Sequence, residues 1–471
     1  MSKPRLFFLL LFALLVASRL CHIGILWEGD TYPLAAAQQM LHGKVLYRDI
    51  WFDKPPLLAA AYLLIDAKPG IPLRLAGALY ALLACWIAFG FARDLWTPRE
   101  GLWAAGLMGF FLVFDFPSAV MPVASDLLML APHLAAVWLA WKRRALWSGI
   151  VAGVAFWINP KGVFVAAACV LWCPAGAGAM AAGFAAVCAV CFATLAVFGA
   201  LGAFWQQVWV WGRLYASSTF LPHPIENGAI RTLDWAGFHI AIVIAAGYFA
   251  CKRESVRWLI WLALAFAGVA MGMRFFPRYY FLLLAPVVLM AARGFLRMGR
   301  RRDLVALLLL IPATRFGTSY ADALRNPNWR DTAMDRDSRA AAALIHHAAA
   351  PGDTLFVWGY RPELYVYTGL PAATIYLDSQ PLTGVPADRH LTSAEPVETV
   401  EPARRRETLT QSHPTFLVDG LGPYNPRLAV TRYPDLRRWL EQYRVMGRTP
   451  GYVIYEITSP SSTPAASPGK P

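Results

Sequence analysis

The feature that most limits the fold of this chain is a series of long apolar runs, which recur from the N-terminus to about residue 318. Of the 471 residues, 58% are hydrophobic and only 15% are charged, whereas about 25% of an ordinary soluble domain is charged. Inside a bilayer a helix satisfies its own backbone hydrogen bonds, so runs of this length predict membrane-spanning helices. The sequence therefore predicts a polytopic α-helical membrane protein with about eleven spans, expected at 6–26, 71–92, 101–119, 124–141, 145–158, 162–174, 177–202, 235–251, 257–273, 279–296 and 303–318.

The distribution of basic residues predicts how these spans are oriented. Lys3 and Arg5 precede the first span, and most loops that follow an even number of spans are basic, such as 142–144 and 300–302. Basic loops favour the cytoplasmic side, so we expect the N-terminus inside and the C-terminus outside. The first run lacks a small-x-small cleavage site, and we expect it to be a retained helix. The net charge of +14 then reflects topology, and we expect no nucleic-acid partner.

This orientation places the unusual polar segments together on the outer face of the membrane. They are the first outer loop, 27–70, and the segments around 126, 159–161, 203–234 and 274–279. Residues 145–174 are therefore expected to form two short helices, because a single helix would place Lys161 at membrane depth and invert every later loop.

The first outer loop carries acids that we expect to take part in chemistry. Glu28 and Asp30 follow the first span directly, and either could act as a general base or as a metal ligand. The alternative is a pair of solvated loop acids. Asp126 begins an apolar run, where an unpaired acid is costly. It either serves the reaction or caps the helix together with Ser125, and the two roles are compatible.

The same loop holds a lysine that has two interpretations. Lys54 lies in the sequence D-K-P-P, where it could bind a phosphate as a point charge. It could instead pair with Asp53 or Asp49 and fix the loop. The two prolines that follow predict a short interfacial helix at 57–65.

Further cations lie on the other outer segments. Lys161, in N-P-K-G, and Arg274 and Arg278, which precede Tyr279, could each bind phosphate oxygens. For the arginines the alternative is interfacial anchoring together with the neighbouring aromatic residues. The loop 205–226 is rich in Trp and contains His223. It is typical of an aromatic belt, and a sugar platform or a polyprenyl groove is the second interpretation.

Composition changes at about residue 320, and apolar runs shrink to strand length. Segments 353–359, 372–377, 414–420 and 452–457 predict strands, and 337–349, 398–412 and 434–444 predict helices. We therefore expect a transmembrane domain at 1–319, an extramembrane α/β domain at 320–458, and a disordered Pro/Ser-rich tail at 459–471. No cysteine follows residue 251, so disulfides do not stabilise the outer domain.

Several motifs resemble the GT-C superfamily of membrane glycosyltransferases, in the branch of the protein O-mannosyltransferases and the lipid A aminoarabinose transferase. They are E-x-D-T-Y at 28–32, G-x-x-x-Y-R-D-x-W-F-D-K-P-P at 43–56, the acid at 126, N-P-K-G at 159–162 and R-F-F-P-R-Y-Y at 274–280. The resemblance implies that Asp30 lies in the motif with the base, that Asp126 is the second acid, and that Lys54 contacts the donor phosphate. Gly29 separates Glu28 from Asp30 where many relatives have adjacent acids, so the identity of the base stays open.

The resemblance implies transfer of a sugar from a polyprenyl-phosphate-linked donor to a lipid, glycan or protein acceptor, by inversion. We expect the reaction at the periplasmic face of a bacterial inner membrane. Tyr32, Tyr279 and His223 are expected to line the substrate site. No cofactor is required by the pattern, and a divalent metal is compatible with it. The alternative function is a lipid-linked saccharide transporter, which should instead place polar residues along a path through mid-bilayer.

Overall fold

The computed structural model describes residues 3–217, 223–251, 256–386, 391–397 and 399–458. The chain divides into two compact units, residues 1–335 and 336–471. The division falls later than the predicted domain boundary at 320, because α18 (Leu310–Arg325) and the start of α19 (Arg330–Ala348) belong with the first unit. The predicted disordered tail, 459–471, lies outside the described residues.

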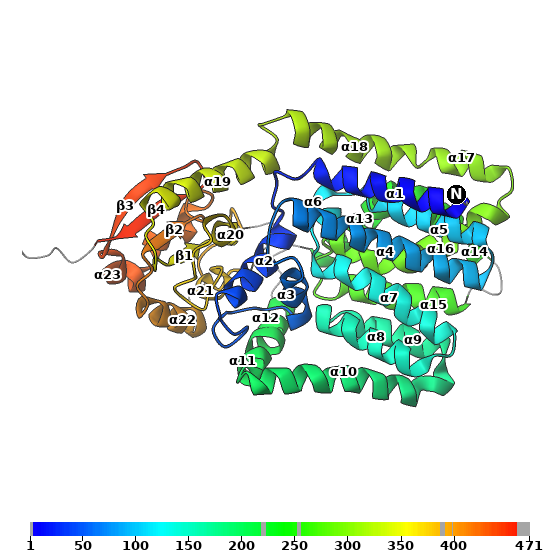
Figure 1. Cartoon of the computed structure of the whole chain (residues 1–471), viewed down its shortest axis with the longest axis horizontal. Coiled ribbons are helices and arrows are strands. Elements are labelled where there is room, and N and C mark those ends of the chain that lie inside the picture. The colour runs from blue at the N-terminus through cyan, green and yellow to red at the C-terminus, as the bar shows by residue number, and fades with distance from the viewer. Residues whose placement is uncertain (1–2, 218–222, 252–255, 387–390, 398, 459–471) are drawn as a thin grey trace, which may run out of the picture. The chain divides into compact units, whose positions relative to one another are not determined.

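The first unit is built from helices (Figure 1). They are α1 (Lys3–Leu20), α2 (Glu28–Leu41), α3 (Pro56–Leu63), α4 (Ile71–Leu95), α5 (Pro98–Phe111), α6 (Pro117–Val120), α7 (Ser125–Trp141), α8 (Ala145–Ile158), α9 (Gly162–Trp172), η1 (Pro174–Gly176), α10 (Ala177–Val197), α11 (Leu201–Phe204), the π-helix η2 (Trp205–Val210), α12 (Trp211–Ser217), α13 (Pro224–Phe238), α14 (Ile240–Ala250), α15 (Val256–Ala270), η4 (Pro277–Tyr280), α16 (Phe281–Arg297), α17 (Arg301–Leu307), α18 (Leu310–Arg325) and the first part of α19 (Arg330–Ala348).

A helix occupies each segment predicted to span the membrane, but the count of about eleven spans is not confirmed. Among the described residues, four helical segments are long and apolar enough to cross a bilayer, or five if the pair α13–α14, bent by 93°, is one span. Helices α7, α8, α9 and α15 are apolar but shorter. The prediction of two short helices around Lys161 is confirmed, since α8 ends at Ile158 and α9 begins at Gly162.

Small residues allow the helices of the first unit to approach closely. Helix α10 packs on α8, where a Cβ atom at Gly149 or Gly183 would collide with the backbone of the opposite helix. Gly294 of α16 lies in the same way against Ala245 of α14. Helix α16 is buried along most of its length and forms the centre of the bundle. Backbone approach of this kind is how helices associate in lipid, where burial of apolar surface gives little driving force.

The second unit is a small α/β domain, as predicted. Its four-stranded sheet has the order β1-β2-β4-β3, with β1 and β2 parallel and the other pairs antiparallel. The strands are β1 (Leu355–Trp358), β2 (Phe416–Asp419), β3 (Tyr443–Arg448) and β4 (Val453–Ile457). The remaining elements are the last part of α19, α20 (Glu363–Thr368), α21 (Gln380–Thr383), α22 (Val400–Thr410), η5 (Pro426–Leu428), η6 (Val430–Arg432), η7 (Pro434–Leu436) and α23 (Arg437–Leu440).

Two predicted elements of this domain are wrong. Segment 372–377 forms only a single bridge, Ala372 to Leu355, because Thr374 Oγ1 bonds to the backbone of Tyr376 and turns the chain. Segment 434–444 is not one helix. It contains η7 and the short α23, and from Tyr443 the chain becomes strand β3, which pairs with β4.

Candidate active site

Asp30 is an internal anchor rather than an accessible acid. It is 0% exposed, and its Oδ2 atom lies 3.1 Å from Nη1 of Arg74, which is itself buried. Its Oδ1 atom accepts hydrogen bonds from the Tyr62 hydroxyl at 2.8 Å and from the Val123 backbone N–H at 2.7 Å. The carboxylate thereby joins α2, α3, α4 and the segment before α7. Burial of Asp30 favours the exposed Glu28 over Asp30 as the base, and the role of either acid stays a prediction.

Glu28 lies on the other side of the same helix start. Its side chain is exposed, and its charge acts on Arg278. The residue between the two acids has a steric role, because a Cβ atom at Gly29 would lie 3.0 Å from Pro122 and from Ala124. Close packing at Gly29 fixes the start of α2, so that one acid faces inward and the other outward.

The loop that carries Lys54 is held in place by backbone contacts. The Tyr47 hydroxyl donates a 2.7 Å hydrogen bond to the Lys54 carbonyl. The buried Gln207 side chain accepts a bond from Phe52 N–H and donates one to the Tyr47 carbonyl, each at 2.8 Å. Gln207 belongs to η2, and π-helical turns occur frequently at functional sites.

The Lys54 side chain pairs with Asp53, as one of its two interpretations predicts. The Nζ–Oδ2 distance is 2.9 Å. Asp49 pairs instead with Arg48, so that version of the pairing is wrong. Lys54 nevertheless remains 38% exposed, whereas Asp53 is 11% exposed, so the cation is the more accessible member of the pair.

Asp126 is the meeting point of three segments that are far apart in the sequence. It is buried in the first turn of α7, where Ala124 is the N-cap residue, so Ser125 and Asp126 are not the cap, although an acid in the first turn still interacts favourably with the helix dipole. Its Oδ1 accepts a hydrogen bond from Asn159 at 3.1 Å and lies 3.6 Å from Lys161 Nζ. Its Oδ2 lies 3.7 Å from Nε of Arg278. The acid thus holds the α8–α9 corner and η4 beside its own helix.

Two tyrosines pack against the cations. Lys161 Nζ lies 2.8 Å from the ring centre of Tyr279. Lys54 and Arg274 both face the ring of Tyr215, at 5.6 Å and 3.7 Å. Such contacts stabilise a cation without neutralising its charge.

The four predicted phosphate ligands therefore differ in their access to solvent. Arg274 is 2% exposed, and its Nη2 atom donates to the Tyr215 carbonyl at 2.9 Å, so its position is structural. Lys161 is 6% exposed. Arg278 is 29% exposed, and Lys54 is the most accessible of the four. A ligand at the surface meets Lys54 and Arg278 first, with Lys161 and Arg274 behind them.

The charges of this cluster influence one another. The net pKa of Lys161 is lowered to about 8. Burial is the largest cause and Arg278 lowers the pKa further, while Asp126 raises it. Burial is the largest single influence on the pKa of Lys54 and lowers it, but the charge and hydrogen bond of Asp53 together with Tyr215 outweigh burial, and the net shift of the pKa is upward. Excess positive charge near Arg278 is the electrostatic condition that favours an anionic ligand.

Tyr32 and His223 are the two remaining residues that were predicted to line the substrate site. The ring of Tyr32 stacks on Phe52 at 5.1 Å, and its hydroxyl donates to the Trp51 carbonyl, so it supports the first loop. His223 is exposed at the start of α13, where its carbonyl accepts hydrogen bonds from Asn227. These hydrogen bonds do not join His223 to the cluster, and its role in lining the substrate site stays a prediction.

The acids of this site lie beside basic side chains. Among the described residues, no group of three or more His, Cys, Asp or Glu could hold an ion. Asp53 pairs with Lys54, and Asp126 lies beside Lys161 and Arg278, so the charge of each acid is balanced within the protein.

An apolar groove lies on the other side of the first outer loop. Its volume is about 530 Å³, and it runs between the loop with α2 and α3 and the side of α10. The lining includes Leu41, Val45, Leu57, Leu63 and Leu195. The groove therefore offers a long apolar surface beside the loop that carries Lys54.

Four residues that support the site were not predicted from the sequence: Arg74, Tyr62, Tyr215 and Gln207. A signal was present for Arg74, since an arginine in an otherwise apolar span requires a buried partner. Gln207 is likewise a polar residue inside an aromatic run. Nothing in the sequence distinguishes Tyr62 or Tyr215 from the other tyrosines.

No protein-family model and no curated protein matches the sequence. Among solved structures, the chain is similar to ArnT from Cupriavidus metallidurans bound to undecaprenyl phosphate, with a TM-score of 0.58 and 16% identity over 96% of this chain and 97% of that chain. The apo state of the same protein gives a TM-score of 0.56 at 15% identity, over 96% of this chain and 98% of that chain. The Archaeoglobus fulgidus oligosaccharyltransferase in complex with Zn and sulfate gives a TM-score of 0.50 at 14% identity, over 93% and 71% of the two chains. These neighbours belong to the GT-C superfamily, so the resemblance predicted from the motifs is confirmed at the level of the fold.

Proposed function

We propose that this protein is a membrane glycosyltransferase that uses a polyprenyl-phosphate-linked sugar. The observation that carries the proposal is the cluster of Lys54, Arg278 and Glu28, in which two accessible cations lie with an accessible acid. The two cations can neutralise a phosphate leaving group, and the acid can take the proton of an acceptor hydroxyl. The fold shared with ArnT supports the same class of reaction.

The donor phosphate is proposed to bind Lys54 and Arg278. Their positive charges would neutralise the charge that develops on the phosphate as the sugar leaves. Lys161 and Arg274 are proposed as positioning residues, because Lys161 holds Asp126 beside Arg278 and Arg274 packs against the Tyr215 ring that Lys54 also faces. The apolar groove beside the Lys54 loop would accept part of the polyprenyl chain.

The acceptor hydroxyl is proposed to lose its proton to Glu28. Its oxygen would then attack the anomeric carbon of the sugar from the side opposite the phosphate. The bond between that carbon and the phosphate oxygen breaks, and polyprenyl phosphate leaves with the electron pair. One displacement of this kind inverts the anomeric centre. No step in this scheme requires a cofactor.

The setting of the reaction follows from the basic loops. We propose a bacterial inner-membrane location, with the site and the C-terminal domain on the periplasmic face. Single cysteines added near residues 143 and 300 of a cysteine-free variant should be protected from a membrane-impermeant label applied from outside. Labelling at residue 300 in intact cells would contradict the proposed orientation.

The test of function is a transfer assay in membranes with a panel of polyprenyl-phosphate sugars. Lys54→Ala should weaken donor binding by about tenfold to a hundredfold, the size expected for one charge-assisted hydrogen bond of about 1.5–3 kcal/mol. Lys68→Ala is a matched control, because Lys68 lies in the same loop but is exposed and pairs with Asp66.

The ion pair with Asp53 allows a second interpretation, in which Lys54 only stabilises the loop. The same experiment distinguishes this role from phosphate binding. If Lys54 only fixes the loop, Lys54→Ala should lower the melting temperature without changing donor affinity, and adding Asp53→Asn should restore stability. That outcome would refute the phosphate role. Movement of the lipid-linked sugar across vesicles with no transfer to any acceptor would favour the transporter.

A further inference from the structure

The second unit contains a polar pocket that the proposed reaction does not use. Its volume is about 500 Å³, within the range of small-molecule sites. It lies at one end of the sheet, where β2 ends at Asp419 and where the turn between β3 and β4 returns beside it. Its polar and aromatic lining includes Asp419, Thr431, Arg432, Arg448, Thr449 and Tyr455.

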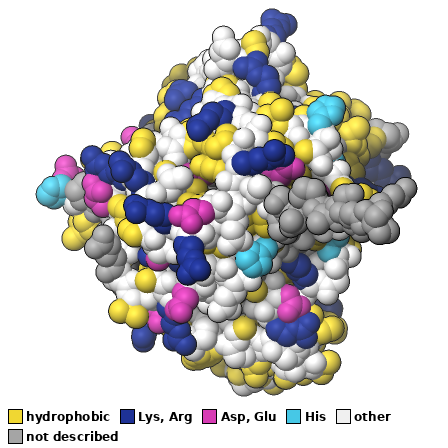
Figure 2. Space-filling view, turned by 90° about the vertical axis from the view of Figure 1, so that its left-hand side faces the viewer, with side chains coloured by type: hydrophobic (Ala, Val, Ile, Leu, Met, Phe, Trp, Pro, Cys, Tyr) yellow, Lys and Arg dark blue, Asp and Glu magenta, His cyan; other side chains and the backbone are white. Residues whose placement is uncertain are grey.

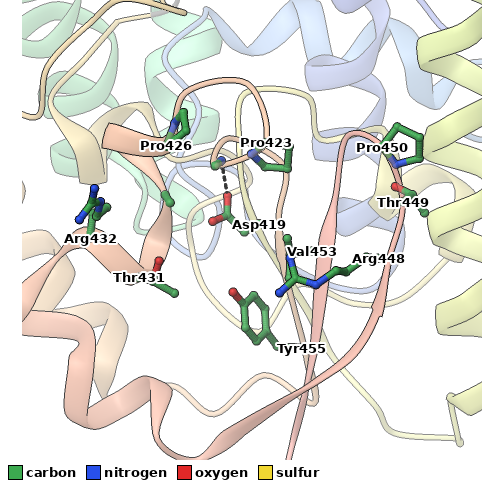
Figure 3. A pocket seen from close by; sticks show the side chains of 12 residues that line it. Asp419, Pro423, Pro426, Thr431, Arg432, Arg448, Thr449, Pro450, Val453 and Tyr455 are labelled. Atoms are coloured by element: carbon green, nitrogen blue, oxygen red, sulfur yellow. Dashed lines mark hydrogen bonds between the residues drawn. The ribbon is translucent and has the colours of Figure 1, made fainter.

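Asp419 holds the floor of the pocket in place, because both of its carboxylate oxygens accept hydrogen bonds from backbone N–H groups. Its Oδ1 accepts hydrogen bonds from the N–H groups of Leu421 and Gly422 at 2.9 and 2.7 Å, and its Oδ2 accepts one from Val430 at 3.0 Å. Figure 3 shows the bond to Gly422 as a dashed line. Asp419 is 2% exposed, so its carboxylate shapes the loop that carries Thr431 and Arg432 and presents little charge to a ligand.

The two arginines of the pocket are exposed, and neither forms an ion pair within the described residues. Arg432 follows the loop that Asp419 braces, whereas Arg448 ends strand β3. In the view of Figure 3 they lie on opposite sides of Asp419, with the Tyr455 ring next to Arg448. Two guanidinium groups held on separate segments provide forked donors that match the oxygens of a carboxylate or a phosphate.

The other lining groups indicate that the ligand is larger than a simple anion. Thr431 and Thr449 supply hydroxyl groups, and Thr449 Oγ1 has no hydrogen-bond partner within the described residues. The Tyr455 side chain adds an aromatic surface. An aromatic ring, hydroxyl donors and two arginines in one pocket fit a sugar that carries an acidic group. Figure 2 shows that Lys and Arg side chains on the visible face are interspersed with Asp and Glu, so recognition of an anion requires a local site.

We propose that this pocket binds an acidic saccharide unit, such as a phosphorylated or carboxylated sugar. Resting on the proposed function, we infer that this saccharide belongs to the acceptor. The pocket would then select acceptors that carry negative charge, while the first unit carries out the transfer.

The binding test uses the full-length protein in detergent and four probes: glucose 6-phosphate, galacturonic acid, glucose and inorganic phosphate. The acidic sugars should bind, glucose should bind about tenfold more weakly or not at all, and phosphate should bind more weakly than glucose 6-phosphate. Arg432→Ala/Arg448→Ala should weaken binding of the acidic sugars at least about tenfold, from the loss of charge-assisted bonds. Arg437→Ala/Arg438→Ala is the matched control, since both residues are exposed on α23 and do not line the pocket.

Unchanged binding in the Arg432/Arg448 double variant, with a normal melting temperature, would overturn the proposal. Equal affinity for glucose and the acidic sugars would also overturn it, and so would phosphate binding as tight as glucose 6-phosphate. If the double variant is destabilised, Arg448→Lys and Arg432→Lys measured singly keep the charge and should retain part of the affinity. The assay is repeated in Glu28→Gln, where binding at the pocket should persist while transfer falls, so failure of the proposed function is distinguishable from failure at this site.

Discussion

Replacement of Asp30 by Asn should destabilise the protein far more than replacement of Glu28 by Gln. The Asp30 carboxylate is fully buried and lies 3.1 Å from Arg74, which is 1% exposed at its side chain. Removing one member of a buried pair leaves an uncompensated charge and costs about 3–5 kcal/mol. We expect the lower end of that range, because Arg74 also donates to the carbonyls of Ile25 and Met121.

The two variants should separate stability from activity. Glu28 is exposed, so Glu28→Gln should leave the melting temperature unchanged and reduce transfer by about a hundredfold to ten-thousandfold, as for loss of a general base. Thermal unfolding of the purified protein in detergent and transfer at a low temperature measure the two effects. Asp30→Asn should lower the melting temperature while its surviving folded fraction transfers sugar.

A double variant provides the control. Arg74→Met removes the buried charge that Asp30→Asn leaves unpaired, so combining the two should recover part of the lost stability. The reasoning is refuted if Asp30→Asn melts like the wild type and has no transfer activity. In that case Asp30 itself is the base, and its buried partners serve to orient it.

Three further perturbations test other parts of the first unit. Lys161 loses its proton as the pH rises through about 8, so donor affinity measured between pH 7 and 9 should fall, and Lys161→Arg should remove this fall because arginine stays charged. Gln207→Leu breaks two buried hydrogen bonds to the backbone of the loop that carries Lys54; donor affinity should drop by about fivefold to a hundredfold, following a cost of about 1–3 kcal/mol for unsatisfied groups. Gly183→Val should destabilise the α8–α10 contact by about 1–3 kcal/mol or more, whereas Gly178→Val, where a Cβ atom meets nothing within 4 Å, should leave the melting temperature unchanged.

Much of the helical unit was predictable because the apolar runs define where helices lie. Even the break at Asn159–Lys161 followed from the charge of later loops, since one continuous helix would have reversed them. The strand β3 was not predicted. The segment Tyr443–Arg448 lacks regular alternation and adjoins α23, and only its pairing with β4 decides between helix and strand.

The members of the site were easier to predict than their roles. Asp126, Lys161 and Arg278 meet, as expected for outer-face residues. Asp30 could not be separated from Glu28 by sequence, because the difference depends on Arg74 in a later helix and on the packing of Gly29. Asp30 is buried and Glu28 is exposed because of tertiary contacts, and these cannot be predicted from the local sequence pattern.

The partners of Asp126 also determine the order in which the site can be completed during synthesis. The acid leaves the ribosome before Asn159 and Lys161, and long before Arg278. A nascent chain that ends before η4 therefore carries Asp126 with only part of its compensating charge. The contact with Arg278 couples completion of the site to arrival of the helix that follows it, α16, which is the most deeply packed element of the bundle. A truncated or stalled chain thus exposes an incompletely paired acid, a feature that distinguishes it from the finished protein.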